Sequence, residues 1–258
     1  STLFLKFLGN QYWMYLTFFW AALPVIASIL LFTSKLPDMN VEHNEEKTIK
    51  STHRTKGILL CMACIFLGAC AENMMSNWIS VYTENVLYIP KMWGDLFGMC
   101  LFAVLLALTR SAYAKFGKNI SRVLMMSMLG AIACYVLVGF SSNAVLSLVG
   151  CVLTGICTSM LWPGTLILME EKIPAVGVSA YALMAAGGDF GATFAPQTMG
   201  IIVDKISATE WAQTLGSSLS LSPEQVGFKV SMLIAAIFPI LGVLLLLYMK
   251  RFFKREIK

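Results

Sequence analysis

Long apolar runs, separated by short polar stretches, dominate the chain. A helix that crosses the ~30 Å hydrocarbon layer of a bilayer needs about 20 mostly apolar residues, and seven windows fit this need. They cover approximately residues 12–32, 57–82, 93–109, 123–140, 144–169, 178–203 and 226–248. The pattern predicts an all-α membrane protein with one helix before a long polar stretch and six helices after it.

The long polar stretch, residues 34–56, carries mixed charge and has no apolar periodicity, which is typical of a flexible or surface-lying linker. We therefore expect three parts: residues 1–33 as the last helix of an N-terminal bundle, residues 34–56 as an inter-bundle linker, and residues 57–258 as a C-terminal six-helix bundle with a basic tail. A twelve-helix, six-plus-six transporter would have this arrangement after loss of its first five helices. The chain starts with Ser1 and shows no signal peptide, so we expect it to be the later part of a longer protein.

The basic residues alternate between the two sides of the expected membrane. Of nineteen lysines and arginines, fifteen fall in the linker, the 110–122 loop, the turn after residue 169 and the C-terminal tail. The other four are Lys6, Lys91, Lys205 and Lys229. Since cytoplasmic loops are enriched in basic residues, the linker and the C-terminus are expected in the cytoplasm. The short loops favour a bacterial inner membrane.

Composition agrees with a membrane protein and excludes several other classes. Hydrophobic residues make up 58% of the chain and charged residues 13%, with a mean hydropathy of +0.75; soluble domains average about 45–50% and about 25%. The net charge of +5 collects in loops, with no basic, aromatic-interleaved face for nucleic acid. The seven cysteines lie in apolar runs, and Cys61 and Cys64 lack a second pair to complete a metal site, so neither a disulfide framework nor a metal is expected.

An ionisable side chain deep in a membrane costs about 2.5–3.5 kcal/mol at a helix centre and needs an explanation. Glu72 lies near mid-depth in its window, and Asn73, Ser76 and Asn77 extend it into a polar stripe. Such a stripe should face a cavity rather than lipid. Binding of a substrate or proton and an interhelical or gating contact both remain open for it.

Asp189 is a second mid-depth carboxylate and a candidate for the same function. It lies among glycines, and Gly187-x-x-x-Gly191 is a helix-packing pattern. Pro196, two turns later, permits a bend. A third carboxylate, Asp95, falls near a helix start, where it would complement the helix dipole.

Trp162 and Pro163 are expected to interrupt the helix in the fifth window, as transporters do near their solute sites. Trp162 would either stack on a ligand ring or pack against helices or lipid. Arg110 either pairs with an acidic residue to lock one conformation or faces lipid phosphates. No H-E-x-x-H, Walker or G-x-S-x-G motif occurs, so neither an enzyme nor a cofactor is expected.

Four segments between about residues 57 and 205 carry a family resemblance. They are Leu67-Gly68-Ala69-Cys70-Ala71-Glu72 with Trp78 and Tyr82, Thr109-Arg110 with Lys115-Phe116-Gly117-Lys118, Leu161-Trp162-Pro163-Gly164, and Gly187-Gly188 with Gly191, Pro196, Gly200 and Asp204. Their order and spacing resemble the major facilitator superfamily, and more narrowly its fucose–proton symporter (sugar permease) subgroup. The basic loop motif departs from that family at Ala114, where an acidic residue is usual.

The resemblance implies secondary transport of a small polar, sugar-like solute by alternating access, with protons as the coupling ion. The expected partners are the solute, protons, the lipid bilayer and an N-terminal bundle. A drug or metabolite exporter of the same superfamily remains an alternative, as does a non-transporting multi-helix membrane protein.

Overall fold

The computed structural model describes residues 2–34, 51–174 and 176–256. These residues form helices joined by short turns, with no strand among them. The chain divides into two compact units, Ser1–Glu45 and Glu46–Lys258. Most of the linker expected at residues 34–56 falls outside the described residues, but the first helix of the second unit already begins at Ser51.

The first unit contains one long apolar helix. A short helix, α1 (Thr2–Leu8), and one 3-10 turn, η1 (Asn10–Tyr12), precede α2 (Trp13–Thr33). Gly9 has a φ of +99° at the bend after α1, a conformation that residues with a side chain rarely adopt. The bounds of α2 follow the expected window of residues 12–32 closely.

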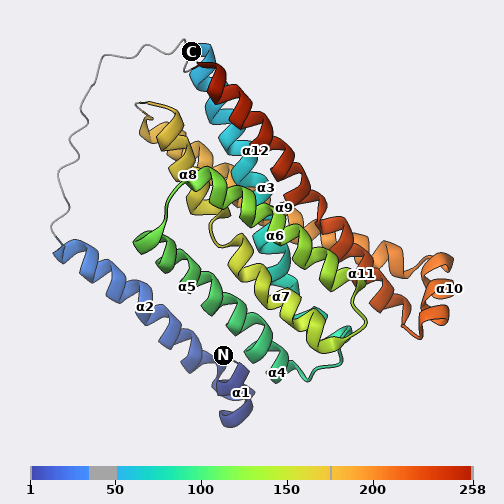
Figure 1. Cartoon of the computed structure of the whole chain (residues 1–258). Coiled ribbons are helices and arrows are strands. Elements are labelled where there is room, and N and C mark those ends of the chain that lie inside the picture. Colours follow the sequence, from blue (N-terminus) through green and yellow to red (C-terminus); the bar gives the residue numbers. More distant parts are fainter. Residues whose placement is uncertain (1, 35–50, 175, 257–258) are drawn as a thin grey trace. The chain divides into compact units, whose positions relative to one another are not determined.

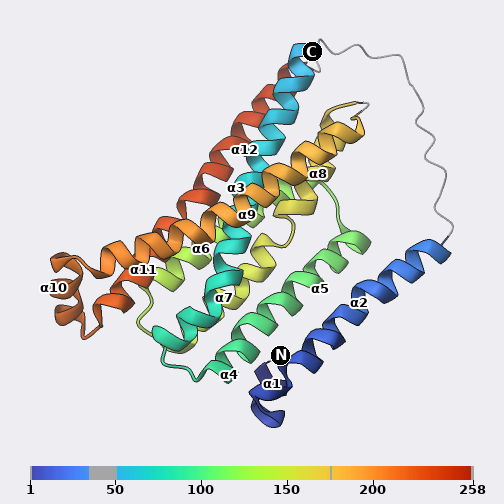
Figure 2. The ribbon, with the colours of Figure 1, turned by 180° about the vertical axis from the view of Figure 1, so that it is seen from behind.

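The second unit is a helical bundle (Figures 1 and 2). Its helices are α3 (Ser51–Asn85), α4 (Lys91–Gly94), η2 (Asp95–Cys100), α5 (Leu101–Phe116), α6 (Ile120–Phe140), α7 (Ala144–Thr158), α8 (Leu161–Lys172), α9 (Val178–Ser207), α10 (Glu210–Leu219), α11 (Pro223–Ala235) and α12 (Ile237–Glu256). The π-helical turn η2 joins α4 to α5 without a break.

Six stretches of the described chain are long and apolar enough to cross a membrane. They are Trp13–Thr33, His53–Asn85, Lys91–Phe116, Ile120–Phe140, Ala144–Lys172 and Pro223–Lys254. These stretches correspond to six of the seven windows expected from the sequence. The prediction of an all-α membrane fold is confirmed.

The remaining expected window, residues 178–203, is helical but less apolar than the other six. It corresponds to α9, a helix of 30 residues, which at 1.5 Å per residue is about 45 Å long. Its glycines, Asp189 and several hydroxyl or amide side chains lower its hydropathy. Helices that bury a small-residue face against a neighbour need less apolar surface than lipid-facing ones, and α9 packs along α3 in this way (Figures 1 and 2).

Two buried tyrosines tie α3 to α6 at two levels. The Tyr135 hydroxyl of α6 donates to the Ala71 carbonyl at 2.7 Å, and the Tyr82 hydroxyl of α3 donates to the Val138 carbonyl at 2.9 Å. Both tyrosines have no exposed surface. The bond from Tyr135 ends on Ala71, the residue before Glu72. It therefore helps to fix the position of the Glu72 carboxylate within the bundle.

Tyr135→Phe should lower the free energy of unfolding by about 1 kcal/mol, because it removes one buried hydrogen bond without changing the ring packing. Unfolding in detergent, followed by tryptophan fluorescence, measures this change. Tyr88→Phe is the matched control, since Tyr88 is 73% exposed, and it should leave the stability unchanged. Equal effects of the two variants would show that the hydrogen bond contributes nothing.

The start of α11 follows its local sequence. The Ser222 hydroxyl accepts from the Gln225 backbone N–H, the Gln225 side chain accepts from the Ser222 N–H, and Pro223 occupies the first turn. The two bonds form a capping box, for which serine at the N-cap and glutamine three residues later are the typical residues.

Candidate functional site

A charge pair inside the bundle joins Glu72 of α3 to Arg110 of α5. Nη2 of Arg110 lies 3.1 Å from each carboxylate oxygen of Glu72. The Glu72 side chain is 16% exposed and that of Arg110 39% exposed. Of the two alternatives that the sequence leaves open for Arg110, the structure shows pairing with an acidic residue.

Arg110 also binds the backbone where the helix formed by α7 and α8 is interrupted. Its Nε donates to the Ser159 carbonyl at 2.8 Å. In an unbroken helix that carbonyl would accept from the N–H of residue 163, but proline has no N–H. Pro163 therefore frees an acceptor, and the Arg110 guanidinium occupies it.

The interruption lies earlier than the sequence pattern suggests. We expect it at residues 162–164, whereas α7 ends at Thr158 and α8 begins at Leu161, so that Ser159 and Met160 form the break. The reason is that proline disturbs the hydrogen bond to the carbonyl four residues before it, while its own position remains compatible with the first turn of a helix. A second break, at Ala236 between α11 and α12, precedes Pro239 in the same manner.

The guanidinium thus connects three helices at one point. The side chain extends from α5, and its guanidinium donates to the Glu72 carboxylate on α3 and to the Ser159 carbonyl between α7 and α8. Coulomb attraction is strong in a low-dielectric interior, and a carboxylate there without a cation is costly. With Glu72 charged, the pair links α3 to α5 and to the break between α7 and α8.

The polar stripe beside Glu72 is partly accessible. Asn73 and Ser76 are half-buried and Asn77 is exposed. Asn73 donates its amide to the Ala69 carbonyl and Asn77 donates to the Asn73 carbonyl, at 3.0 and 2.8 Å. Each amide group therefore satisfies one donor within its own helix.

Trp162 lies against α9 rather than against open space. A Cβ added at Gly188 would come within 2.6 Å of the Trp162 ring, so the ring fills the place of a side chain there. Leu161 lies similarly close to Gly68 of α3. The contact of Trp162 is a packing contact between α8 and α9, and the half-buried ring leaves part of its surface accessible.

Gly187 and Gly191 bring α9 next to α3. A Cβ at Gly191 would lie 2.5 Å from the Phe66 carbonyl oxygen, and one at Gly187 would lie 2.6 Å from Cγ of Met62. Further along α9, the Pro196 carbonyl accepts the indole N–H of Trp78 at 3.1 Å. The two helices are thus in close contact through small residues and one side-chain hydrogen bond.

Asp189 is not brought to Glu72. It is exposed, and within the described residues its carboxylate makes no hydrogen bond or ion pair. Gly187 and Gly191 face Met62 and Phe66, which places Asp189 near the level of residue 64 on α3. Glu72 lies eight residues further, about 12 Å along the helix. The two carboxylates therefore belong to different places on the bundle.

The Ser159 carbonyl belongs to the candidate site but is not among the residues predicted from the sequence. The signal is present, since Pro163 identifies the carbonyl of residue 159 as an unoccupied acceptor. Its partner lies 49 residues earlier in the chain, which no local pattern can reveal.

A cavity of about 550 Å³ opens toward the α11 end of the bundle. Trp78, Asn85, Asp204, Ser207 and Glu224 are among the residues that line it, and neither Glu72 nor Arg110 is. Asn85 donates to the Glu224 carboxylate at 3.1 Å across this cavity. In the described part of the chain no three histidine, cysteine or acidic side chains gather as metal ligands.

A comparison with protein-family models identifies the family of the chain. The family model of the Major Facilitator Superfamily matches residues 1–196. Searches of curated proteins and of solved structures found no match. With its membrane-length apolar helices, this is a multi-pass membrane protein, and it belongs to the major facilitator superfamily of secondary transporters.

Proposed function

We propose that the chain is the C-terminal half of a proton-coupled secondary transporter for a small polar, sugar-like solute. In this proposal the six helices after the linker rock against an N-terminal bundle, with the linker and C-terminus in the cytoplasm. The observation that carries the proposal is the pairing of Glu72 with Arg110 inside an apolar bundle. A carboxylate deep in a membrane protein is costly to bury, so its presence here favours a functional role.

Glu72 is the proposed proton carrier and Arg110 its charge partner. A proton that enters from the acidic side neutralises Glu72 and weakens its attraction to Arg110, so that α3 separates from α5 more easily. Because Arg110 keeps its bond to the Ser159 carbonyl, its guanidinium stays oriented while Glu72 is neutral. Loss of the proton on the opposite side restores the pair.

The solute would be bound by the accessible polar groups on the same bundle. Asn73, Ser76 and Asn77 offer hydroxyl and amide groups to a sugar, and the free part of the Trp162 ring offers an apolar face. Asp189 lies about 12 Å from the level of Glu72 along the bundle, so it is assigned to the second candidate function below and not to this site. Gly187, Gly191, Pro163 and Pro196 are proposed to serve packing and bending rather than solute contact.

Transport in proteoliposomes that contain the full-length protein tests this function. An outside-acidic gradient should drive accumulation of at least one member of a radiolabelled sugar panel. Glu72→Gln should abolish accumulation, because its side chain cannot carry a proton, yet retain exchange of internal for external sugar, which needs no net proton movement. Glu210→Gln, an exposed residue on α10, is the matched control and should transport normally.

Two results would contradict the proposal. Equal accumulation with and without the gradient would exclude proton coupling. Normal accumulation by Glu72→Gln would show that the proton binds elsewhere.

The second candidate function is export of drugs or metabolites that are organic cations. A cluster of phenylalanine rings on and next to α9 favours it. Phe190, 64% exposed, directly follows Asp189 in sequence, and Phe194, 42% exposed, lies about one turn later on the same helix. Their rings are 5.7 and 6.0 Å from that of Phe66. Exposed rings next to a carboxylate suit an aromatic or quaternary cation. Efflux of such a cation, lost in Asp189→Asn and kept in Glu72→Gln, would favour this candidate over the symporter.

A further inference from the structure

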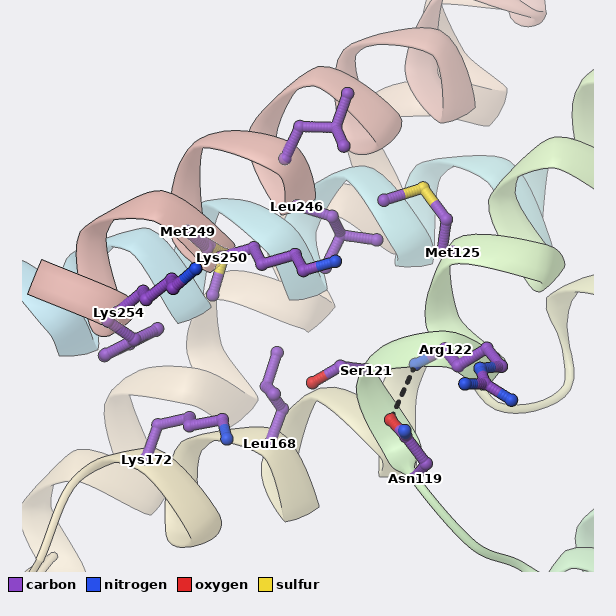
Figure 3. Close-up of a pocket in the computed structure, with 12 residues that line it drawn as sticks. Asn119, Ser121, Arg122, Met125, Leu168, Lys172, Leu246, Met249, Lys250 and Lys254 are labelled. Carbon is purple, nitrogen blue, oxygen red and sulfur yellow. Dashed lines mark hydrogen bonds between the residues drawn. The ribbon is translucent and has the colours of Figure 1, made fainter. Parts of the chain in front are cut away.

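A second cavity lies at the other end of the bundle, where α6 begins and α8 and α12 end. Its volume is about 550 Å³, within the range of pockets that hold small ligands. Figure 3 shows it. Its twelve lining residues are Asn119, Ser121, Arg122, Met125, Leu168, Lys172, Leu246, Leu247, Met249, Lys250, Phe253 and Lys254.

Four of the lining residues are cationic, and they come from three helices. Lys172 extends from the end of α8, and Lys250 and Lys254 from α12, toward one space into which the Ser121 hydroxyl of α6 also points (Figure 3). Arg122 lies at the rim. None of the twelve residues is acidic, and in the described part of the chain none of the four cations forms an ion pair. Their mutual repulsion favours an anion between them.

Apart from Asn119, the remaining wall of the cavity is apolar. Leu168, Leu246, Met249 and Phe253 are buried and Met125 is half-buried. A hydrated inorganic anion gains nothing from such a wall, whereas an amphiphile can place its anionic group at the lysines and its hydrocarbon against these side chains. In a membrane protein, cations at helix ends next to apolar surface mark the level of lipid headgroups.

We propose that this cavity binds an anionic phospholipid. The lipid phosphate lies among Lys172, Lys250, Lys254 and the Ser121 hydroxyl, and the glycerol and upper acyl carbons contact Met125 and Leu246. One lipid then bridges the ends of α6, α8 and α12. The proposal is independent of the charge pair and of the solute.

Lipid-dependent thermal stability of the full-length protein in a neutral detergent tests the site. We expect phosphatidylglycerol to raise Tm in a saturable manner, because a ligand of the folded state stabilises it by mass action. Phosphatidylcholine should not do so. The double variant Lys172→Gln/Lys250→Gln should bind phosphatidylglycerol at least about tenfold more weakly, since each lysine contributes to headgroup attraction.

The matched control is Lys115→Gln/Lys118→Gln, which removes two positive charges near the same end of the bundle but outside the cavity. It should bind phosphatidylglycerol as the wild type does. Should the double pocket variant fold poorly, Lys250→Gln alone, with bound lipid counted by native mass spectrometry, gives the same comparison.

Three outcomes would overturn the proposal. An equal loss of affinity in the control variant would reduce the effect to general surface charge. An unchanged affinity in the pocket variants would place the lipid elsewhere. A rise in Tm with inorganic pyrophosphate that removes the response to phosphatidylglycerol would identify the cavity as a site for a soluble anion.

Discussion

Arg110→Gln is expected to destabilise the protein by roughly 2 kcal/mol, and the double variant Arg110→Gln/Glu72→Gln by less than that. The single change leaves the Glu72 carboxylate, 16% exposed, without its cation. Loss of one partner of a fully buried pair costs about 3–5 kcal/mol, and the 39% exposure of Arg110 reduces this figure. Neutralising both residues removes the unpaired charge together with the pair.

A double-mutant cycle measures this coupling. Free energies of unfolding in detergent would be compared for the wild type, Arg110→Gln, Glu72→Gln and the double variant. Arg251→Gln is the matched control, because Arg251 is exposed on α12 and makes no ion pair in the described residues, and it should change the stability little. Additive effects of the two single changes would contradict a coupled pair and remove the basis of the proposed proton switch.

Gly191→Ala should destabilise the bundle by about 1–3 kcal/mol, the usual cost of overpacking. The added carbon would lie 2.5 Å from the Phe66 carbonyl oxygen and 3.2 Å from Cβ of Ala69. Since the first contact is with backbone, side-chain rotation cannot relieve it, and α9 must move away from α3. Gly191 also accepts a weak hydrogen bond from the Cys70 thiol at 3.5 Å, which this movement would break.

Gly200→Ala on the same helix provides the control. There the added carbon would meet the Trp78 ring at 3.4 Å, an ordinary contact, and the higher helix propensity of alanine should stabilise the helix by up to about 1 kcal/mol. The two alanine variants should therefore shift Tm in opposite directions. A similar shift in both would show that the approach of α9 to α3 is not limited by Gly191.

The sequence predicts those features that depend on neighbours within a few turns. The apolar windows give the helices, because a bilayer imposes both length and composition. The Ser222 capping box follows from a spacing of three residues. Two features depart from these local patterns. The glycines of α9 make it less apolar than the other long helices. The break between α7 and α8 lies before Pro163, because proline acts on the carbonyl four residues before it.

The candidate site depends on contacts that local patterns cannot supply. Counting residues gives the depth of Glu72 and Asp189, but not the direction in which each carboxylate faces. The pairing of Glu72 with Arg110 joins residues 38 apart in the chain, and it depends on how α3 and α5 are rotated about their axes. That rotation is set by tertiary packing, including the tyrosine bonds between α3 and α6.

The bond from Arg110 to the Ser159 carbonyl has a consequence for mutational scanning. The acceptor is a main-chain atom, so every amino acid at position 159 supplies it, and the Ser159 hydroxyl itself bonds back to the Ile156 carbonyl at 2.8 Å. A side-chain scan of α7 and α8 would pass over this contact entirely. The residue that encodes it is Pro163, which touches neither Arg110 nor Glu72 through a polar atom and acts by the hydrogen bond that it cannot make.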